Sequence, residues 1–63
     1  MLQYKISFYR NGKDFPEASG VYYREFYSYK DMKEWANDTL NNDSLYARYH
    51  VEEISIDEFL ENT

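Results

Sequence analysis

The residues of this 63-residue chain that could perform acid–base or nucleophilic chemistry are few and are poorly placed for it. His50 is the only histidine and there is no cysteine, which leaves too few ligands for a zinc site and no Cys–His pair. Glu52 and Glu53 are neighbours in a predicted strand and therefore face opposite sides of a sheet. Asp57 and Glu58 fall in the first turn of a predicted helix, where carboxylates interact favourably with the helix dipole.

Both glycines lie in predicted turns, so no glycine-rich phosphate-binding loop is present. We therefore expect a protein that is not an enzyme and that has no cofactor and no metal site.

The most regular set of carboxylates lies in the segment from Ser28 to Asn42. Asp31, Glu34 and Asp38 are spaced i, i+3 and i+7, which on a helix forms a stripe with Cβ atoms about 5–6 Å apart. Glu34 and Asp38 are a like-charge pair, and Asp38 opposes the dipole near the helix end, so helix stability alone does not explain the stripe. It predicts a partner-binding surface. The alternative is a solvated face on which Lys30 pairs with Glu34.

The same segment has the clearest helical period of the chain. Its apolar positions share one face: Met32, Trp35, Ala36, Thr39 and Leu40. Because one thin sheet can hardly cover a whole indole, we expect Trp35 to lie partly in the core and partly at an interface. The candidate partner-binding residues are Asp31, Met32, Glu34, Trp35, Asp38 and Thr39.

The residues at both ends of this helix are typical of helix caps. Ser28 is the predicted N-cap, and Asp31 completes a Ser-x-x-acid capping box. Tyr27 and Met32 occupy the two positions of a hydrophobic staple, in which the residue before the cap packs on the first turn. Asn41 and Asn42 are expected to form a left-handed helix end.

Three segments have the composition of strands. Residues 2–9 alternate cleanly, with Leu2, Tyr4, Ile6 and Phe8 on the predicted core face. Residues 21–27 carry rings on both faces, so neither face is plainly the core side. Residues 45–54 form the third strand, whose predicted core residues are Leu45, Ala47, Tyr49 and Val51.

The remaining segments are a connection and a tail. Asn11-Gly12 is a strong hairpin signal, and Pro16 interrupts any pairing that follows it. The connection is therefore either a tight hairpin with an early break or, as we expect, a loop from Asn11 to Gly20 with a few paired residues around Lys13 to Phe15 and a second turn at its end. Residues 55–58 form another capping box, with Ile54 and Phe59 at the staple positions, and predict a short C-terminal helical turn.

These elements predict one α+β domain over residues 1–63 in the order β-β-α-β. The expected sheet has three strands in the order 2-1-3, mixed or antiparallel, with one helix packed on one face. A chain of this size has a marginal core, and without disulfides or metal it is expected to gain support by association. The two outer strands offer open edges for pairing. We therefore expect a homodimer.

The net charge of −5 is unevenly distributed. Residues 1–30 carry a net charge of +2, and residues 31–63 carry −7. This asymmetry argues against direct nucleic-acid binding, which depends on Lys and Arg at phosphates. It is compatible with an acidic surface that competes for a basic surface on another protein, or with acidity that serves only solubility. No apolar run is long enough to span a membrane and no signal-peptide block is present, so we expect a cytoplasmic protein.

The layout resembles the small dimeric uracil-DNA glycosylase inhibitors of short-tailed Bacillus phages. The likeness lies in the short, acidic, cysteine-free β-β-α-β chain, the tyrosine-rich second strand VYYREFYSY, and a helix that starts at Ser28 with Asp31-Met32 following. In that family two helices of a dimer line a hydrophobic groove that traps an apolar residue of the enzyme's DNA-binding loop, and acidic groups stand in for phosphates. The resemblance implies Met32 and Ala36 at the groove positions. Lys33 departs from the acid expected there, so Trp35 would supply the apolar surface.

Two classes of function follow. The first is a phage-type inhibitor that occupies the DNA-binding cleft of a host uracil-DNA glycosylase, or of another defence enzyme as an anti-CRISPR or anti-restriction protein. The second is an acidic, antitoxin-like interaction module without DNA mimicry. A sheet that stacks single-stranded RNA on its tyrosines is a weaker alternative, because the charge of the carboxyl half opposes it.

Overall fold

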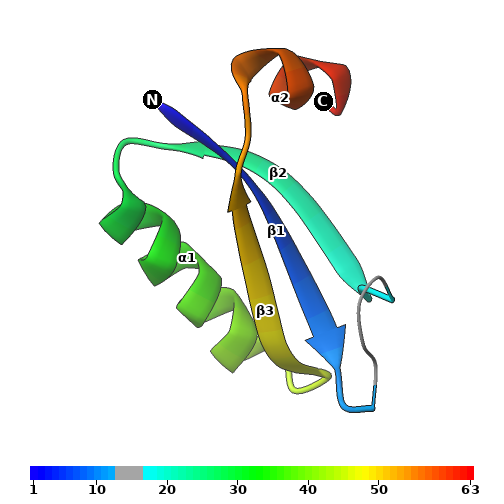
Figure 1. Ribbon diagram of the computed structural model, residues 1–63. Helices are drawn as coiled ribbons and strands as arrows, with labels where there is room; N and C mark the ends of the chain where they lie inside the picture. Colours follow the sequence, from blue (N-terminus) through cyan, green and yellow to red (C-terminus); the bar gives the residue numbers. More distant parts are fainter. Residues whose placement is uncertain (13–16) are drawn as a thin grey trace.

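The structure is a computed structural model, and it describes residues 1–12 and 17–63. Its elements follow the order β1 (Leu2–Arg10), β2 (Gly20–Phe26), α1 (Tyr29–Asn42), β3 (Tyr46–Glu53) and α2 (Ile56–Glu61). The sheet has the strand order β2-β1-β3, and both neighbours run antiparallel to β1. Helix α1 crosses one face of this sheet, and α2 stands at one end of it (Figure 1). The predicted α+β class and strand order are confirmed.

The core forms between β1 and α1, as the alternation in the sequence predicts for three of its four residues. The fourth, Leu2, is 37% exposed, because it lies at the open end of the strand. Tyr4, Ile6 and Phe8 point from β1 toward the helix, and Met32 and Ala36 meet them from α1. All five are 3% exposed or less, so this layer excludes water almost completely. Burial of these side chains provides the main driving force for packing the helix on the sheet.

The opposite face of β1 is more buried than a half-solvated strand would be. Ser7 is 6% exposed and Tyr9 is 2% exposed, although both point away from α1. The Arg48 guanidinium carbon lies 4.9 Å from the centre of the Tyr9 ring. A central strand is flanked by side chains of both neighbours, which explains why the predicted polar face of β1 is partly covered.

The register of β2 resolves which of its faces is the core side. Tyr22 pairs with Ile6 and Phe26 pairs with Leu2, so these rings share the helix-covered face. Strand β2 begins at Gly20 and ends at Phe26, one residue earlier at each end than predicted. Gly20 pairs with Phe8 inside the ladder and is not part of a turn.

A bulge in the β1–β3 ladder overturns part of the prediction for the third strand. Tyr9 pairs with Arg48 and Arg10 pairs with Tyr46, so β3 contains one extra residue, Ala47, at this point. The shift brings Tyr46 to the core face beside Tyr49 and Val51. The predicted core residue Ala47 is exposed, as is Leu45, of which 56% is accessible.

The capping predictions hold at the start of each helix. The Ser28 hydroxyl accepts a hydrogen bond from the Asp31 amide at 3.2 Å, and the Ser55 hydroxyl accepts one from Glu58 at 3.1 Å. The predicted hydrophobic staple, a packing contact between Tyr27 and Met32, is wrong, because Tyr27 is 83% exposed while Met32 is fully buried.

The predicted left-handed end at Asn41-Asn42 is also wrong. Helix α1 ends at Asn42, and the C-cap residue Asp43 has an extended backbone and donates its amide to the Thr39 carbonyl. Among the described residues only Gly12 has a positive φ, of 81°. The pairing predicted around Lys13 to Phe15 lies outside the described residues. No helix in the described part of the chain is long and apolar enough to cross a membrane.

Glycine is needed at position 20 because the Tyr46 side chain lies very close to it, and not because its φ angle is positive. A Cβ atom at this position would collide with the hydroxyl of Tyr46. Tyr46 in turn stacks on Phe8, with ring centres 4.9 Å apart and planes 18° apart. The absent side chain therefore leaves room for the ring that anchors the start of β3.

We predict that Gly20→Ala lowers the free energy of unfolding by about 1–3 kcal/mol, the usual range for an overpacked core. In a Tyr46→Phe background the same change should cost much less, because the colliding oxygen is gone. Urea denaturation of the two single variants and the double variant measures this coupling. An equal cost of Gly20→Ala in both backgrounds would contradict the explanation.

Candidate partner-binding surface

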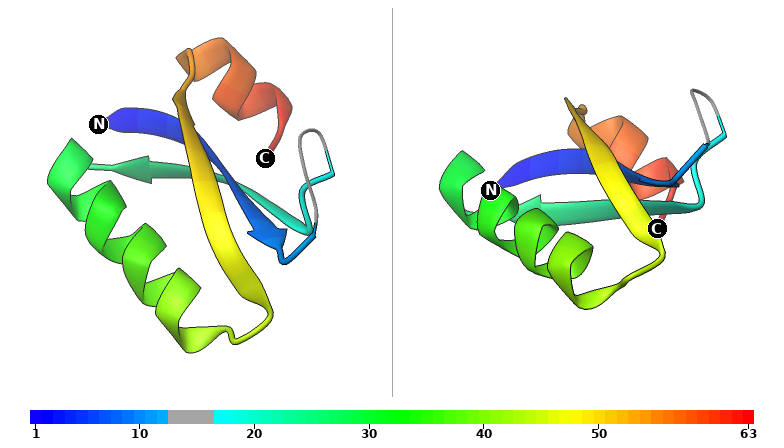
Figure 2. Two further views of the ribbon diagram at one scale, coloured as in Figure 1. Left: turned by 60° about the horizontal axis from the view of Figure 1, so that its bottom comes forward. Right: turned by 90° about the horizontal axis from the view of Figure 1, so that it is seen from below.

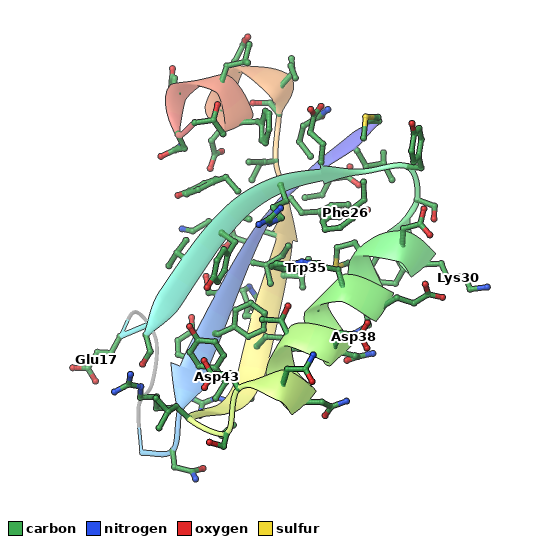
Figure 3. All side chains as sticks on the ribbon, turned by 180° about the vertical axis from the view of Figure 1, so that it is seen from behind. Glu17, Phe26, Lys30, Trp35, Asp38 and Asp43 are labelled. Atoms are coloured by element: carbon green, nitrogen blue, oxygen red, sulfur yellow. The ribbon has the colours of Figure 1, made fainter. Side chains whose placement is uncertain are left out.

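The three carboxylates predicted to form a stripe lie on the outer side of α1. Asp31, Glu34 and Asp38 are all exposed, and their i, i+3, i+7 spacing on a continuous helix places them in one row. We call this row the α1 acidic stripe. Among the described residues no ion pair joins Lys30 to Glu34, and Figure 3 shows Lys30 extending away from the helix. The stripe is therefore accessible to a basic partner.

Lys33, which interrupts the stripe in the sequence, points elsewhere in the structure. Its ammonium donates to the Tyr49 hydroxyl at 2.7 Å, and that hydroxyl donates to the Asn37 amide oxygen at 2.8 Å. The hydrogen bond with Tyr49 raises the pKa of Lys33, because it stabilises the charged ammonium. Tyr49 thus holds Lys33 and Asn37 on the β3 side of α1, which separates this positive charge from the carboxylates.

Trp35 lies on the opposite, β2 side of the helix and is partly buried. Its ring centre lies 5.5 Å from that of Tyr22, 5.8 Å from that of Phe26 and 6.0 Å from that of Phe8. The Arg24 guanidinium carbon sits 5.0 Å from the Trp35 ring centre. The part of the indole that the core leaves uncovered is therefore capped by a charged side chain.

The other predicted apolar contacts are less available than expected. Met32 is fully buried between α1 and the sheet, and it cannot contact a partner in this conformation. Thr39 is partly buried, and its hydroxyl donates to the Trp35 carbonyl at 2.9 Å. The structure thus brings together the α1 acidic stripe and the edge of Trp35. Across the part of α1 that the sequence predicted to form a groove, the apolar residues Met32 and Ala36 are buried.

Two tyrosines at the start of α1 are more exposed than the sequence suggested. Tyr27 is 83% exposed and Tyr29 is 59% exposed, and they flank the N-cap Ser28. No signal in the sequence indicates this exposure, because the residue before an N-cap often packs against the helix, as predicted for Tyr27. They add aromatic surface near the first carboxylate of the stripe.

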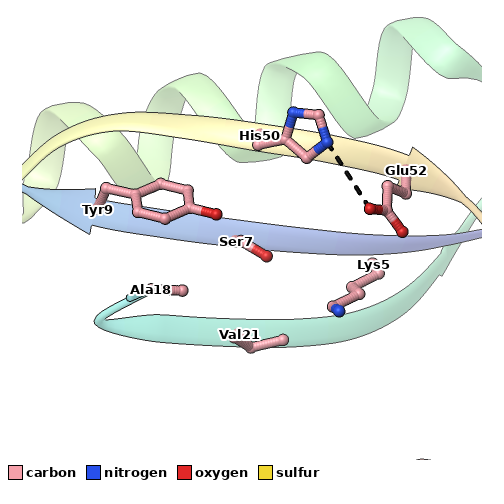
Figure 4. Close-up of a pocket in the computed structure, with 7 residues that line it drawn as sticks. All are labelled: Lys5, Ser7, Tyr9, Ala18, Val21, His50 and Glu52. Carbon is pink, nitrogen blue, oxygen red and sulfur yellow. Dashed lines mark ion pairs between the residues drawn. The ribbon is translucent and has the colours of Figure 1, made fainter. Parts of the chain in front are cut away.

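The open face of the sheet carries a hollow of about 170 Å³ (Figure 4). Within it the His50 Nε2 atom lies 3.8 Å from a Glu52 carboxylate oxygen. Both side chains are about half exposed, so solvent screens this pair strongly. The hollow is lined by Lys5, Ser7, Tyr9, Ala18, Val21, His50 and Glu52.

Two tyrosine hydroxyls in the core have altered acidity. Burial raises the pKa of Tyr4, and the nearby Glu53 carboxylate raises it further. Hydrogen bonding with Tyr22, followed by burial, raises the pKa of Tyr46. Both hydroxyls therefore stay neutral at physiological pH and serve the packing of the sheet.

Comparison of this chain with models of protein families, with curated proteins and with solved structures finds no match.

We predict that Trp35→Ala lowers the free energy of unfolding by about 3 kcal/mol, at the lower end for truncating a buried tryptophan because the ring is partly exposed. Arg24→Ala should cost about 0.5–1 kcal/mol, since it removes only the guanidinium over the ring. Urea denaturation followed by far-ultraviolet circular dichroism measures both values. A loss below about 1 kcal/mol for Trp35→Ala would show that the indole is incidental to the core.

Proposed function

We propose that this chain is a small acidic inhibitor, of the phage type, that occupies the DNA-binding cleft of a host uracil-DNA glycosylase. The observation that supports it most is the α1 acidic stripe: three exposed carboxylates in one row on a capped helix, unpaired among the described residues. A glycosylase cleft is basic because it binds DNA phosphates. The stripe offers negative charges with fixed spacing to such a cleft. The protein would act in the cytoplasm of the host cell, as a binding protein and not as an enzyme.

The electrostatic part of this interaction accelerates association. Complementary charges steer two proteins together and raise the association rate, and salt screens this effect over about 10 Å at 0.1 M ionic strength. The net charge of −5 adds a long-range attraction to any basic cleft. Since the backbone that carries these carboxylates is already helical, association has to order only their side chains.

The apolar part of the interaction involves Trp35. Arg24, which covers the outer part of the indole, is itself exposed and belongs to an edge strand. In the proposed complex the Arg24 side chain turns aside, and an apolar residue of the glycosylase's DNA-binding loop packs on the uncovered ring. Burial of apolar area is insensitive to screening, so this contact holds the complex once it has formed.

We predict that the protein inhibits excision of uracil from a labelled duplex by a bacterial uracil-DNA glycosylase. Inhibition should persist at high salt, with slower association, because only the steering contribution is screened. Glu34→Lys with Asp38→Lys should slow association by about tenfold or more and change dissociation much less.

The matched control carries the same change in charge on another part of the surface. Glu17→Lys with Glu52→Lys also replaces two exposed acids, and Figure 3 shows Glu17 far from α1. This control should slow association only by its effect on net charge. Undiminished uracil excision with the protein in molar excess would eliminate the glycosylase as the target. An anti-CRISPR or anti-restriction inhibitor, or an antitoxin-like acidic module, would then remain as the candidate functions.

We also predict that the protein is a homodimer. Strands β2 and β3 are both edges of the sheet, and each presents unpaired backbone groups on its outer side. A chain of 63 residues without cysteine gains substantial stability when such an edge is covered. Sedimentation at micromolar concentration measures the mass. A single species near 7.7 kDa would contradict the prediction.

A further inference from the structure

Helix α2 exposes apolar side chains that the fold does not use. Ile56 is 48% exposed and Leu60 is 61% exposed. They are spaced i and i+4, so they are neighbours in one row on the helix surface. Phe59, one position away, is only partly exposed, and Ile54 just before the helix is buried at 9%. Ile54 anchors the segment to the sheet, while the row of Ile56 and Leu60, called here the α2 apolar row, remains uncovered.

Hydrogen bonds stabilise both ends of α2. The Ser55 hydroxyl caps the first turn, and the Asn62 side-chain amide donates to the Glu58 carbonyl at 2.8 Å. Before the helix begins, the Ile54 amide donates to the Gln3 carbonyl of β1 at 3.0 Å. The α2 apolar row is therefore presented by an ordered element that is tied to the central strand.

Carboxylates border this row along the helix. Asp57 and Glu61 are spaced i and i+4, so they form a second row directly beside Ile56 and Leu60, and both are exposed. Residues 56–61 contain no basic side chain, and no ion pair within the described residues neutralises these acids. The exposed surface of α2 is thus an apolar strip with a negative border.

We propose that α2 is a second docking surface, which takes a basic segment of a partner protein with an apolar side chain at its centre. The apolar side chain would pack on Ile56 and Leu60, and flanking Lys or Arg residues would pair with Asp57 and Glu61. A second copy of this chain fits the surface poorly. It would bring Asp57 and Glu61 of the two copies face to face at this surface, where like charges repel.

This surface is separate from the α1 acidic stripe. Helix α2 lies at the end of the sheet and contacts β1, whereas α1 covers one face of the sheet (Figure 2). The two helices lie apart in each view of the ribbon. The proposal therefore does not depend on the glycosylase as a partner, and the two surfaces can be tested independently.

The test uses a short amphipathic helical peptide with leucines on one face and lysines beside them, titrated into the full chain labelled with ¹⁵N. We expect amide shifts confined to residues 54–62 and the adjoining end of β1. Ile56→Ser with Leu60→Ser should weaken binding about tenfold or more, because the two exposed side chains supply the apolar contact. Asp57→Asn with Glu61→Gln should weaken it about threefold and reduce its dependence on salt.

The matched control removes exposed apolar surface elsewhere. Val21→Ser with Leu45→Ser replaces side chains that are 43% and 56% exposed near the other end of the sheet, and it should leave the affinity unchanged. Peptides with glutamate in place of lysine, or serine in place of leucine, should not bind. Unchanged affinity of the Ile56, Leu60 variant, an equal loss in the control, or shifts centred on α1 would overturn the proposal. Conversion of a dimer to a monomer by the Ile56, Leu60 variant would also overturn it, because the row would then be covered by a second copy.

Discussion

Phe8 is the residue on which the packing of every core element depends. It lies on the central strand with none of its side chain exposed. Its ring lies within 6.0 Å, centre to centre, of four others: Tyr22 of β2, Trp35 of α1, and Tyr46 and Tyr49 of β3. Aromatic pairs of this kind contribute beyond the area they bury. In a chain of this size, one ring thus joins three strands and a helix.

This concentration of rings explains how a small acidic chain accommodates so many aromatic residues. Among the described residues, the core side of the sheet holds seven of them: Tyr4, Phe8, Tyr22, Phe26, Trp35, Tyr46 and Tyr49. The Tyr49 hydroxyl reaches polar partners at the edge of the core, where it bonds with Lys33 and Asn37. Because the core supplies the apolar burial, most acids of the carboxyl half lie exposed on the surface.

The distribution of those acids gives the molecule two separate negative surfaces. One is the α1 acidic stripe, which lies next to Trp35 and its cover, Arg24. The other borders Ile56 and Leu60 on α2. Each combines carboxylates with apolar area, which is the combination that lets charge guide encounter while apolar contact retains the partner. The shallow hollow on the open face of the sheet lacks this combination, since Lys5, His50 and Glu52 mix both signs of charge there.

The sequence by itself determined the elements, their order and the serine caps at the start of both helices. Local signals suffice for these, because the 3.6-residue period of α1, the alternation of β1 and the serine caps act within a few residues. It also identified the α1 acidic stripe, since the spacing along a helix fixes which side chains share a row. Only the tertiary structure decided which face of β2 is buried and that Tyr46 replaces Ala47 in the core. Those outcomes depend on pairing between distant strands, where one extra residue reverses the side on which a side chain lies. The burial of Met32 and the covering of Trp35 by Arg24 were likewise decided by packing, because a helical period shows which residues share a face but not what the sheet places against them.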